Sequence, residues 1–282
     1  MARRTRRVQR RPRVTDRRRS ENTRAFVIFA LSILAVLGLG AVAFVNRAPA
    51  LDEGNGCVRG QLVPPGHTVV LIDQTDPLGR RQIDYVKTLI LLEYERLKPG
   101  ERLTVRPIDA DPDSTAREFS RCRVRRGADV LGIGANPEMI EADFRRIVGR
   151  PLNEYLNGLA NVPTAAASPI LETIATAVDS PDFGANVPER RLIIVSDMAQ
   201  HSGQASQYGQ PPQLELAPSA SDFLRRNLAD VDVRVHYLRR PALSALQTPA
   251  HREFWTRWLR SNGARVELDW GTQMVEPRPD AA

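Results

Sequence analysis

Two near-continuous apolar runs end on an aspartate, and they constrain the fold of this chain more than any other feature. The first reads Thr68-Val-Val-Leu-Ile-Asp73, and the second reads Arg191-Leu-Ile-Ile-Val-Ser-Asp197. Runs of β-branched and aliphatic residues without alternation are typical of strands that are buried on both faces of a parallel sheet. Such sheets bind ligands beyond the carboxyl ends of their strands. The two runs therefore predict a parallel sheet with Asp73 and Asp197 at its ligand-binding edge.

The rest of the folded part alternates between strand and helix patterns. We expect strands at 103–108, 130–133, 192–196, 231–238 and 266–270, and helices at 80–98, 139–159, 168–178, 222–228 and 253–260. Pro151 should kink or split the second of these helices. This alternation predicts a Rossmann-like, doubly wound, mostly parallel α/β fold, with Trp255 and Trp258 packed on the sheet.

An uncharged segment precedes this domain. Residues 25–45 contain 21 residues without a charge, which is enough for one transmembrane helix. The basic residues 1–24, which include 11 arginines, should stay on the cytoplasmic side as an unstructured tail. A cleaved signal peptide is the alternative, because Ala41-Val-Ala43 and Ala48-Pro-Ala50 resemble small-residue cleavage sites, but the apolar core of a signal peptide is shorter.

These features predict a single-pass protein of the inner membrane with its folded domain in the periplasm. Residues 1–24 carry a net charge of +9 within a chain total of +7, so the remaining residues carry −2. That balance argues against a nucleic-acid-binding domain. We divide the sequence into a basic tail (1–24), a transmembrane helix (25–45), a proline- and glycine-rich stalk (46–66), the α/β domain (67–272) and a C-terminal tail (273–282).

The chain has two cysteines, Cys57 and Cys122, and both follow the apolar segment. An oxidising compartment outside the cytoplasm permits a disulfide between them, and an even count leaves no thiol over. Two unpaired thiols are the alternative, because the sequence alone does not place the two Cα atoms within bridging distance.

Three motifs resemble the loops of the von Willebrand factor A-type (VWA) domain. They are the strand ending in Asp73-Gln-Thr75, the small-residue loop leading into Ser168-Pro-Ile-Leu and a helix, and the strand ending in Ser-Asp197. The resemblance covers residues 66–271 and is closest to membrane-anchored bacterial members. It implies a Rossmann-like sheet whose carboxyl edge carries a metal-ion-dependent adhesion site.

In that site the resemblance implies Mg²⁺ or Mn²⁺ held by Asp73, Thr75, Ser168 and Asp197. The first loop of the family reads Asp-x-Ser-x-Ser, and here Pro77 stands at the fifth position. Proline offers no side-chain oxygen, so the implied site is partly degenerate. Asp76 could replace the missing ligand, or it could simply start a turn with Pro77. Each aspartate could also be a turn or cap residue, and Ser168 could be the N-cap of the following helix, where cap and ligand roles are compatible.

Three functions are compatible with this pattern. The resemblance implies a binding module, not an enzyme, in which an acidic side chain of a protein partner completes the coordination of the cation. Pro77 favours the alternative of a metal-free structural subunit of an envelope assembly. A phosphohydrolase of the haloacid dehalogenase kind would need a second aspartate where Thr75 stands and a lysine in a strand-end loop, and the sequence supplies neither.

Overall fold

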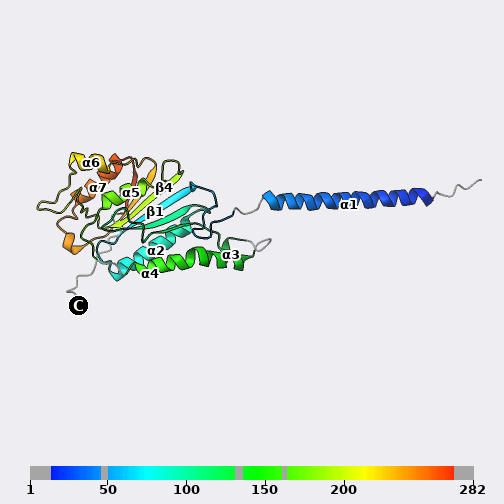
Figure 1. Ribbon diagram of the computed structural model, residues 1–282, viewed down its shortest axis with the longest axis horizontal. Coiled ribbons are helices and arrows are strands. Elements are labelled where there is room, and N and C mark those ends of the chain that lie inside the picture. Colours follow the sequence, from blue (N-terminus) through cyan, green and yellow to red (C-terminus); the bar gives the residue numbers. More distant parts are fainter. Residues whose placement is uncertain (1–13, 46–49, 131–135, 161–163, 270–282) are drawn as a thin grey trace, which may run out of the picture. The chain divides into compact units, whose positions relative to one another are not determined.

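The computed structural model describes residues 14–45, 50–130, 136–160 and 164–269. The chain forms two compact units, residues 1–49 and residues 50–282 (Figure 1). The C-terminal tail predicted at 273–282 lies outside the described residues, as does most of the strand predicted at 130–133.

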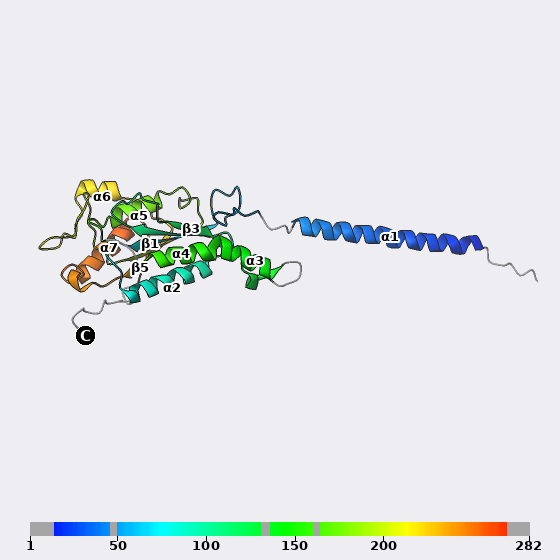
Figure 2. The same ribbon diagram turned by 60° about the horizontal axis from the view of Figure 1, so that its bottom comes forward.

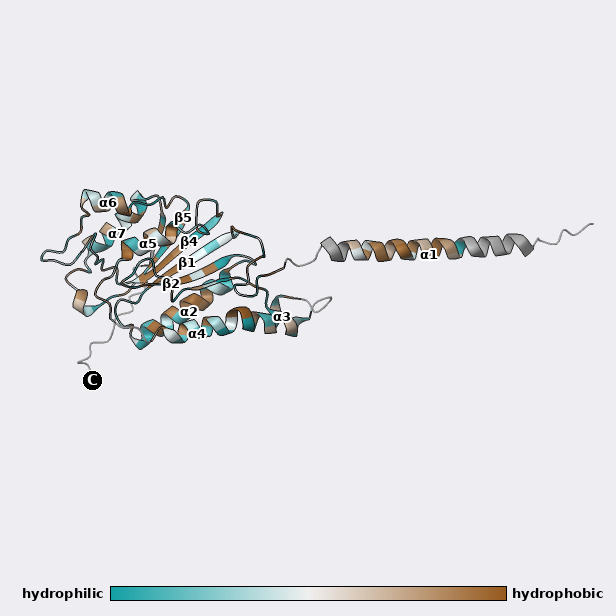
Figure 3. Cartoon of the chain, viewed as in Figure 1, coloured by the Kyte–Doolittle hydropathy of each residue, from teal (hydrophilic) through white to brown (hydrophobic). Residues whose placement is uncertain are grey.

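The described part of the first unit is the helix α1 (Val14–Val45), which is long and apolar enough to cross a membrane between Arg24 and Ala41. Its large apolar side chains, such as Phe26 and Leu34, are exposed, and Figure 3 shows the apolar stretch along it. The prediction of an unstructured basic tail is wrong for residues 14–24, because the helix begins at Val14. Arginine has a high helix propensity, so these residues can continue the apolar helix.

The second unit is built on a six-stranded sheet in the order β3-β2-β1-β4-β5-β6. The strands are β1 (Gly66–Asp73), β2 (Arg102–Ile108), β3 (Phe119–Cys122), β4 (Glu189–Ser196), β5 (Val231–Tyr237) and β6 (Arg265–Asp269). All neighbours are parallel except β2 and β3. Every residue of β1 is buried, as its unbroken apolar run predicts. The predicted fold class, a mostly parallel α/β sheet flanked by helices, is confirmed.

Helices cover both faces of the sheet. They are α2 (Arg80–Arg96), α3 (Pro137–Phe144), α4 (Arg150–Gly158), α5 (Ile170–Val178), α6 (Pro218–Leu224) and α7 (Pro249–Ser261). Side chains of α5, α6 and α7 share one buried core with the sheet, and those of α2 and α4 share the other. Figure 2 shows α5 and α6 on one side of the strands and α2 and α4 on the other. Trp255 and Trp258 are buried in the first core, as predicted.

Two local elements differ from the sequence prediction. The antiparallel edge strand β3 was not expected, because it has four residues and only Phe119 and Cys122 are buried. The helix expected at 139–159 is split by a π-helical turn, Arg145–Gly149, so that Pro151 lies in the first turn of α4. Proline is tolerated there because the first helical N–H groups have no partner within the helix.

Residues 50–58 of the predicted stalk form a turn that is attached to the sheet. Cys57 and Cys122 are joined by a disulfide, and the amide of Cys122 donates to the carbonyl of Asn55 at 2.9 Å. Leu51 packs against the core on the α2 side. The folded unit therefore starts near residue 50, earlier than the predicted boundary at 67.

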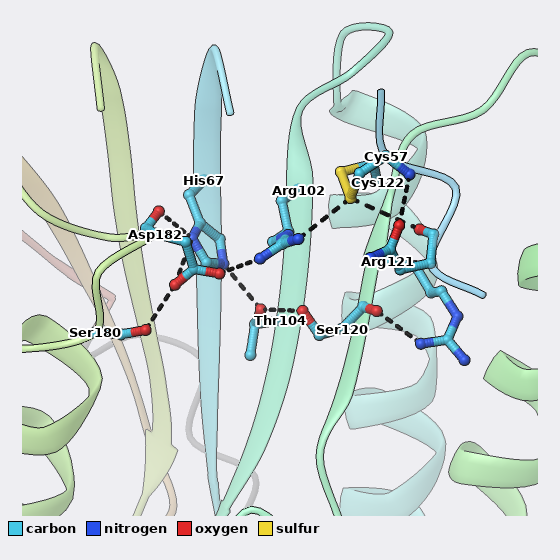
Figure 4. A network of polar contacts seen from close by, with 10 residues as sticks. Cys57, His67, Arg102, Thr104, Ser120, Arg121, Cys122, Ser180 and Asp182 are labelled. Carbon is cyan, nitrogen blue, oxygen red and sulfur yellow. Dashed lines mark hydrogen bonds and ion pairs between the residues drawn. A yellow bond between two sulfur atoms is a disulfide. The ribbon is translucent and has the colours of Figure 1, made fainter. Parts of the chain in front are cut away.

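A buried polar network surrounds this attachment at the amino end of the sheet (Figure 4). The imidazole of His67 contacts the Asp182 carbonyl through Nδ1 and the Thr104 hydroxyl through Nε2, each at 2.8 Å. Arg102 pairs with the Asp182 carboxylate and places Nη2 3.3 Å from Cys57 Sγ. Burial lowers the pKa of His67, so the ring is neutral near pH 7. The network lies where β1 and β2 begin and where the antiparallel strand β3 ends.

Candidate functional site

The candidate site lies where β1 and β4 end side by side. The chain proceeds from β1 towards β2 and β3 in one direction, and from β4 towards β5 and β6 in the other. The carboxyl edge between two such strands is a topological switch point, where open α/β sheets bind their ligands. Asp73 is the last residue of β1, and Asp197 directly follows β4. The two predicted aspartates therefore lie at the same edge of the sheet.

Asp73 is fully buried, and three donors hold its carboxylate. Its Oδ1 accepts from the amide of Thr75 at 3.1 Å and from the Thr75 hydroxyl at 2.6 Å. Its Oδ2 accepts from the Ser196 hydroxyl at 2.6 Å, and the same hydroxyl accepts from the amide of Met198 at 2.7 Å. Hydrogen bonds of this kind stabilise a buried negative charge. They also join the loop after β1 to the loop after β4.

Asp197 is paired with an arginine that the sequence analysis did not identify. Its Oδ1 accepts from the amide of Ala199 at 2.9 Å, and its Oδ2 accepts from Arg240 Nε at 2.5 Å. Only 4% of the Asp197 side chain and 9% of the Arg240 side chain are exposed. Burial, followed by the charge of Asp73, raises the pKa of Asp197 in spite of this ion pair. A carboxyl group with a raised pKa binds a proton more readily, so burial and the neighbouring Asp73 both disfavour a negative charge on Asp197.

Ser168 belongs to a loop that contacts both neighbouring loops. Its amide donates to the carbonyl of His201 at 2.7 Å, and the amide of Ala165 in the same loop donates to the carbonyl of Thr75 at 2.7 Å. The Ser168 hydroxyl is buried and has no hydrogen-bond partner among the described residues. Leaving such a group unpaired costs on the order of 1–3 kcal/mol. This is the cost that a ligand at the hydroxyl would remove.

The expected N-cap role of Ser168 is wrong. Helix α5 begins at Ile170, so Pro169 and not Ser168 is the N-cap residue. The side chain of Pro169 makes no capping hydrogen bond to the first turn. The side chain of Gln200, on the loop after β4, does this instead, because its Oε1 accepts from the amide of Leu171 at 2.9 Å. The Ser168 hydroxyl is thus left free of the helix.

Asp76 and Tyr208 lie at the rim of the site. Asp76 is partly exposed, and Tyr208 lies half-exposed on the long loop after β4. Burial raises the pKa of the Tyr208 phenol, and the charges of Asp197, Asp76 and Asp73 raise it further. All three carboxylates are therefore within electrostatic reach of one phenol. Only Asp76 of this pair was predicted from the sequence.

The oxygen atoms fit a hard cation in part. Asp73, Thr75 and Ser168 supply carboxylate and hydroxyl oxygens, which Mg²⁺ and Mn²⁺ accept. Asp197 is the poorer donor, because Arg240 already occupies one of its oxygens. Within the described ranges, no three His, Cys, Asp or Glu side chains form a cluster that could hold a metal by themselves. Any cation here would depend on the hydroxyl groups.

Side chains of helix α7 contact the backbone of the loop after β4. Met198 follows Asp197 and adopts a φ of 60°, which a non-glycine residue rarely takes. Its carbonyl accepts from Trp255 Nε1 at 2.9 Å and lies 3.1 Å from His251 Nε2. The hydroxyl of Tyr237 lies 2.7 Å from His251 Nδ1. A buried hydrogen-bond network therefore fixes the unusual backbone next to the site.

We expect His251 to make the protein less stable in mild acid. Burial lowers its pKa to about 4, against 6.5 for an exposed histidine. Between these two pH values His251 is protonated in the unfolded chain but neutral in the folded chain, so protons favour the unfolded state. The free energy of unfolding is therefore not reduced by His251 above pH 6.5, and it falls by about 2 kcal/mol between pH 7 and pH 5. Asp197, with its raised pKa, acts in the opposite direction. Urea unfolding at both pH values should show a smaller acid loss in His251→Gln than in the wild type, and equal losses would contradict the assignment.

Comparisons with known proteins add little to this geometry. No protein-family model and no curated protein matches the chain. Among solved structures, an aerotolerance-related membrane protein from Bacteroides fragilis is 12% identical, with a TM-score of 0.32, over 61% of this chain and 66% of that one. The conserved hypothetical protein BatB from Bacteroides thetaiotaomicron is 16% identical, with a TM-score of 0.31, over 62% of this chain and 66% of that one. The chain thus spans just under two thirds of each.

Proposed function

We propose that this chain is a membrane-anchored, VWA-like binding module that recognises a protein partner outside the cytoplasm. The single observation that supports this proposal most is the arrangement at the switch point. Asp73 and Asp197, 124 positions apart in the sequence, follow neighbouring strands there. The loop of Ser168 pairs through its backbone with both following loops, and the buried hydroxyl of Ser168 lacks a partner among the described residues. The apolar helix α1, which follows a basic segment, would anchor the module in the inner membrane with its N-terminus in the cytoplasm.

In this proposal a Mg²⁺ or Mn²⁺ ion is held by Asp73, Thr75 and Ser168, with Asp76 at the rim and Asp197 joining once Arg240 moves away. When bound, the ion would offer an open position to an acidic side chain of the partner. The chain itself would supply the ligand oxygens at the edge of the sheet, and the neighbouring loops would shield these oxygens from water.

We expect full-length protein in detergent micelles to bind Mn²⁺ weakly, as measured by electron paramagnetic resonance. Asp73→Asn should reduce the affinity at least tenfold, because it removes the charge nearest to the hydroxyl ligands, and Ser168→Ala should reduce it to a smaller degree. Asp222→Asn is the matched control, since the side chain of Asp222 is 79% exposed on α6 and should have no effect. Binding that is the same in all variants would contradict the assignment of the site.

A second candidate is a metal-free structural subunit of an envelope assembly. The pairing of Arg240 with Asp197 and the presence of Pro77 favour it. In that case the wild type would bind no Mn²⁺, and any protein partner that copurifies with the chain would stay bound in chelator.

We propose binding instead of catalysis for this edge. The two lysines of the chain are Lys87 on α2 and Lys98, which pairs with Glu189 at the start of β4, the opposite end of that strand from Asp197. A phosphoryl-transfer site would need a cation near Asp73 that is available to the phosphate, and the cation found there, Arg240, is paired with Asp197. We expect no turnover of a generic phosphate ester, and turnover that Asp73→Asn abolishes would restore the phosphohydrolase hypothesis.

A further inference from the structure

The guanidinium of Arg240 lies between the two loops that a bound ion would bridge. Nε donates to Asp197 Oδ2 at 2.5 Å on the loop after β4, and Nη1 lies 3.4 Å from the carbonyl of Pro77 on the loop after β1. The arginine is buried, and the side chain of Gln247 accepts from its backbone amide at 2.9 Å. Its position is therefore fixed from three directions.

Arg240 contacts the two residues at which this edge differs from an oxygen-rich cation site, Pro77 and Asp197. Pro77 brings no side-chain oxygen, yet its backbone carbonyl faces the arginine. Asp197 brings a carboxylate, yet its outer oxygen is taken by the same arginine. The guanidinium of Arg240 thus contacts both Pro77, the position without a side-chain oxygen, and Asp197, the carboxylate that is already paired.

The charges around Arg240 agree with this arrangement. Burial lowers the pKa of Arg240, but the charges of Asp197, Asp73 and Asp76 together raise it above its usual value. These are the same three carboxylates that act on Tyr208 at the rim. The guanidinium therefore sits in the negative field that would attract a divalent cation.

We propose that Arg240 is a built-in cation that occupies the place of the divalent ion and keeps the site closed until it is displaced. This inference rests on the cation site of the proposed function. A fixed positive charge and a divalent ion repel each other strongly at this range in a buried site, so both cannot occupy the edge in the arrangement seen here. Arg240 thus acts as a gate that weakens cation binding, and a partner or a high ion concentration would have to move it away.

The experiment compares Mn²⁺ binding by full-length protein in detergent micelles. Arg240→Gln should bind at least tenfold more tightly than the wild type. Arg240→Lys, which keeps the charge, should stay close to the wild type. Arg239→Gln is the matched control, because it removes the same charge one position away, from a side chain that donates to the carbonyl of Gln247.

The outcomes separate this inference from the proposed function. Tighter binding in Arg240→Gln supports the gate, whether the wild type binds weakly or not at all. Equal or weaker binding in Arg240→Gln than in a wild type that binds Mn²⁺ overturns the gate and leaves the cation site in place. Failure of both proteins to bind overturns the cation site and the gate together.

A second variant covers the case in which Arg240→Gln does not fold because Asp197 is left as an unpaired buried charge. Asp197→Asn combined with Arg240→Gln removes both charges and leaves Asp73, Thr75 and Ser168 intact. Replacement of a buried ion pair by neutral groups is often tolerated. This double variant should bind Mn²⁺ more tightly than Asp197→Asn alone, which keeps Arg240, and equal or weaker binding overturns the gate.

Discussion

Replacing both cysteines, Cys57→Ser with Cys122→Ser, is expected to lower the free energy of unfolding by about 2–4 kcal/mol. The disulfide joins positions 65 residues apart, and a cross-link of that span restricts the unfolded chain strongly. Both cysteines are buried, so the serine hydroxyls also lose water without an equivalent partner. Urea unfolding of the wild type and the double variant, followed by circular dichroism, measures the difference.

Two controls make this result specific. Wild-type protein should show no alkylatable thiol in mass spectrometry before reduction, and it should lose similar stability when a dithiol reductant is present. Arg59→Ser is a matched surface control, because this exposed side chain lies two positions from Cys57 and takes no part in the bridge. An unchanged unfolding midpoint in the double cysteine variant would show that the bridge does not stabilise the fold.

The disulfide also determines where the folded unit begins. It fixes the turn at residues 50–58 to β3, and Arg102 contacts both the Cys57 sulfur and the buried His67 network (Figure 4). The sequence predicted a stalk here because its prolines and glycines are typical of linkers. Composition does not reveal a cross-link to a residue 65 positions away.

The central strands were predictable because burial on both faces leaves an unbroken apolar run. That holds for β1 and β4, and it placed Asp73 and Asp197 correctly at the carboxyl edge. The edge strand β3 has no such run, because Ser120 and Arg121 are partly exposed between its buried ends. Short edge strands depend on pairing with a neighbour, and a single sequence shows that pairing poorly.

Arg240 was not predicted because its role depends on contacts that are distant in the sequence. Its partners Asp197 and Pro77 lie 43 and 163 positions away. One local signal was present: two adjacent arginines follow the buried strand β5, at the same edge as the predicted aspartates. A charged residue directly after a central parallel strand should therefore be considered with the acidic residues after its neighbours.

Truncation of Trp255 to alanine should reduce the free energy of unfolding by about 3–5 kcal/mol, the range for large aromatic side chains in a core. Trp255 is fully buried and contacts the rings of Phe254 and Trp258, with centroid distances of 5.3 and 6.1 Å. Its removal leaves a cavity beneath the loop after β4 and also removes the hydrogen bond from Trp255 Nε1 to the carbonyl of Met198. Urea unfolding measures this loss, and a change below about 1 kcal/mol would contradict the packing argument.

The conservative variant Trp255→Phe separates packing from support of the site. Phenylalanine keeps most of the buried surface but cannot donate to the Met198 carbonyl, so about 1–2 kcal/mol should be lost. Because Met198 holds a φ of 60° directly after Asp197, release of this hydrogen bond should let the loop relax and weaken Mn²⁺ binding. Trp258→Phe, in the same core, is the matched control and should leave binding unchanged. If both variants bind Mn²⁺ equally well, the geometry of the loop after β4 does not depend on Trp255, and the contacts of Ser196, Ala199 and His251 are sufficient to hold its backbone.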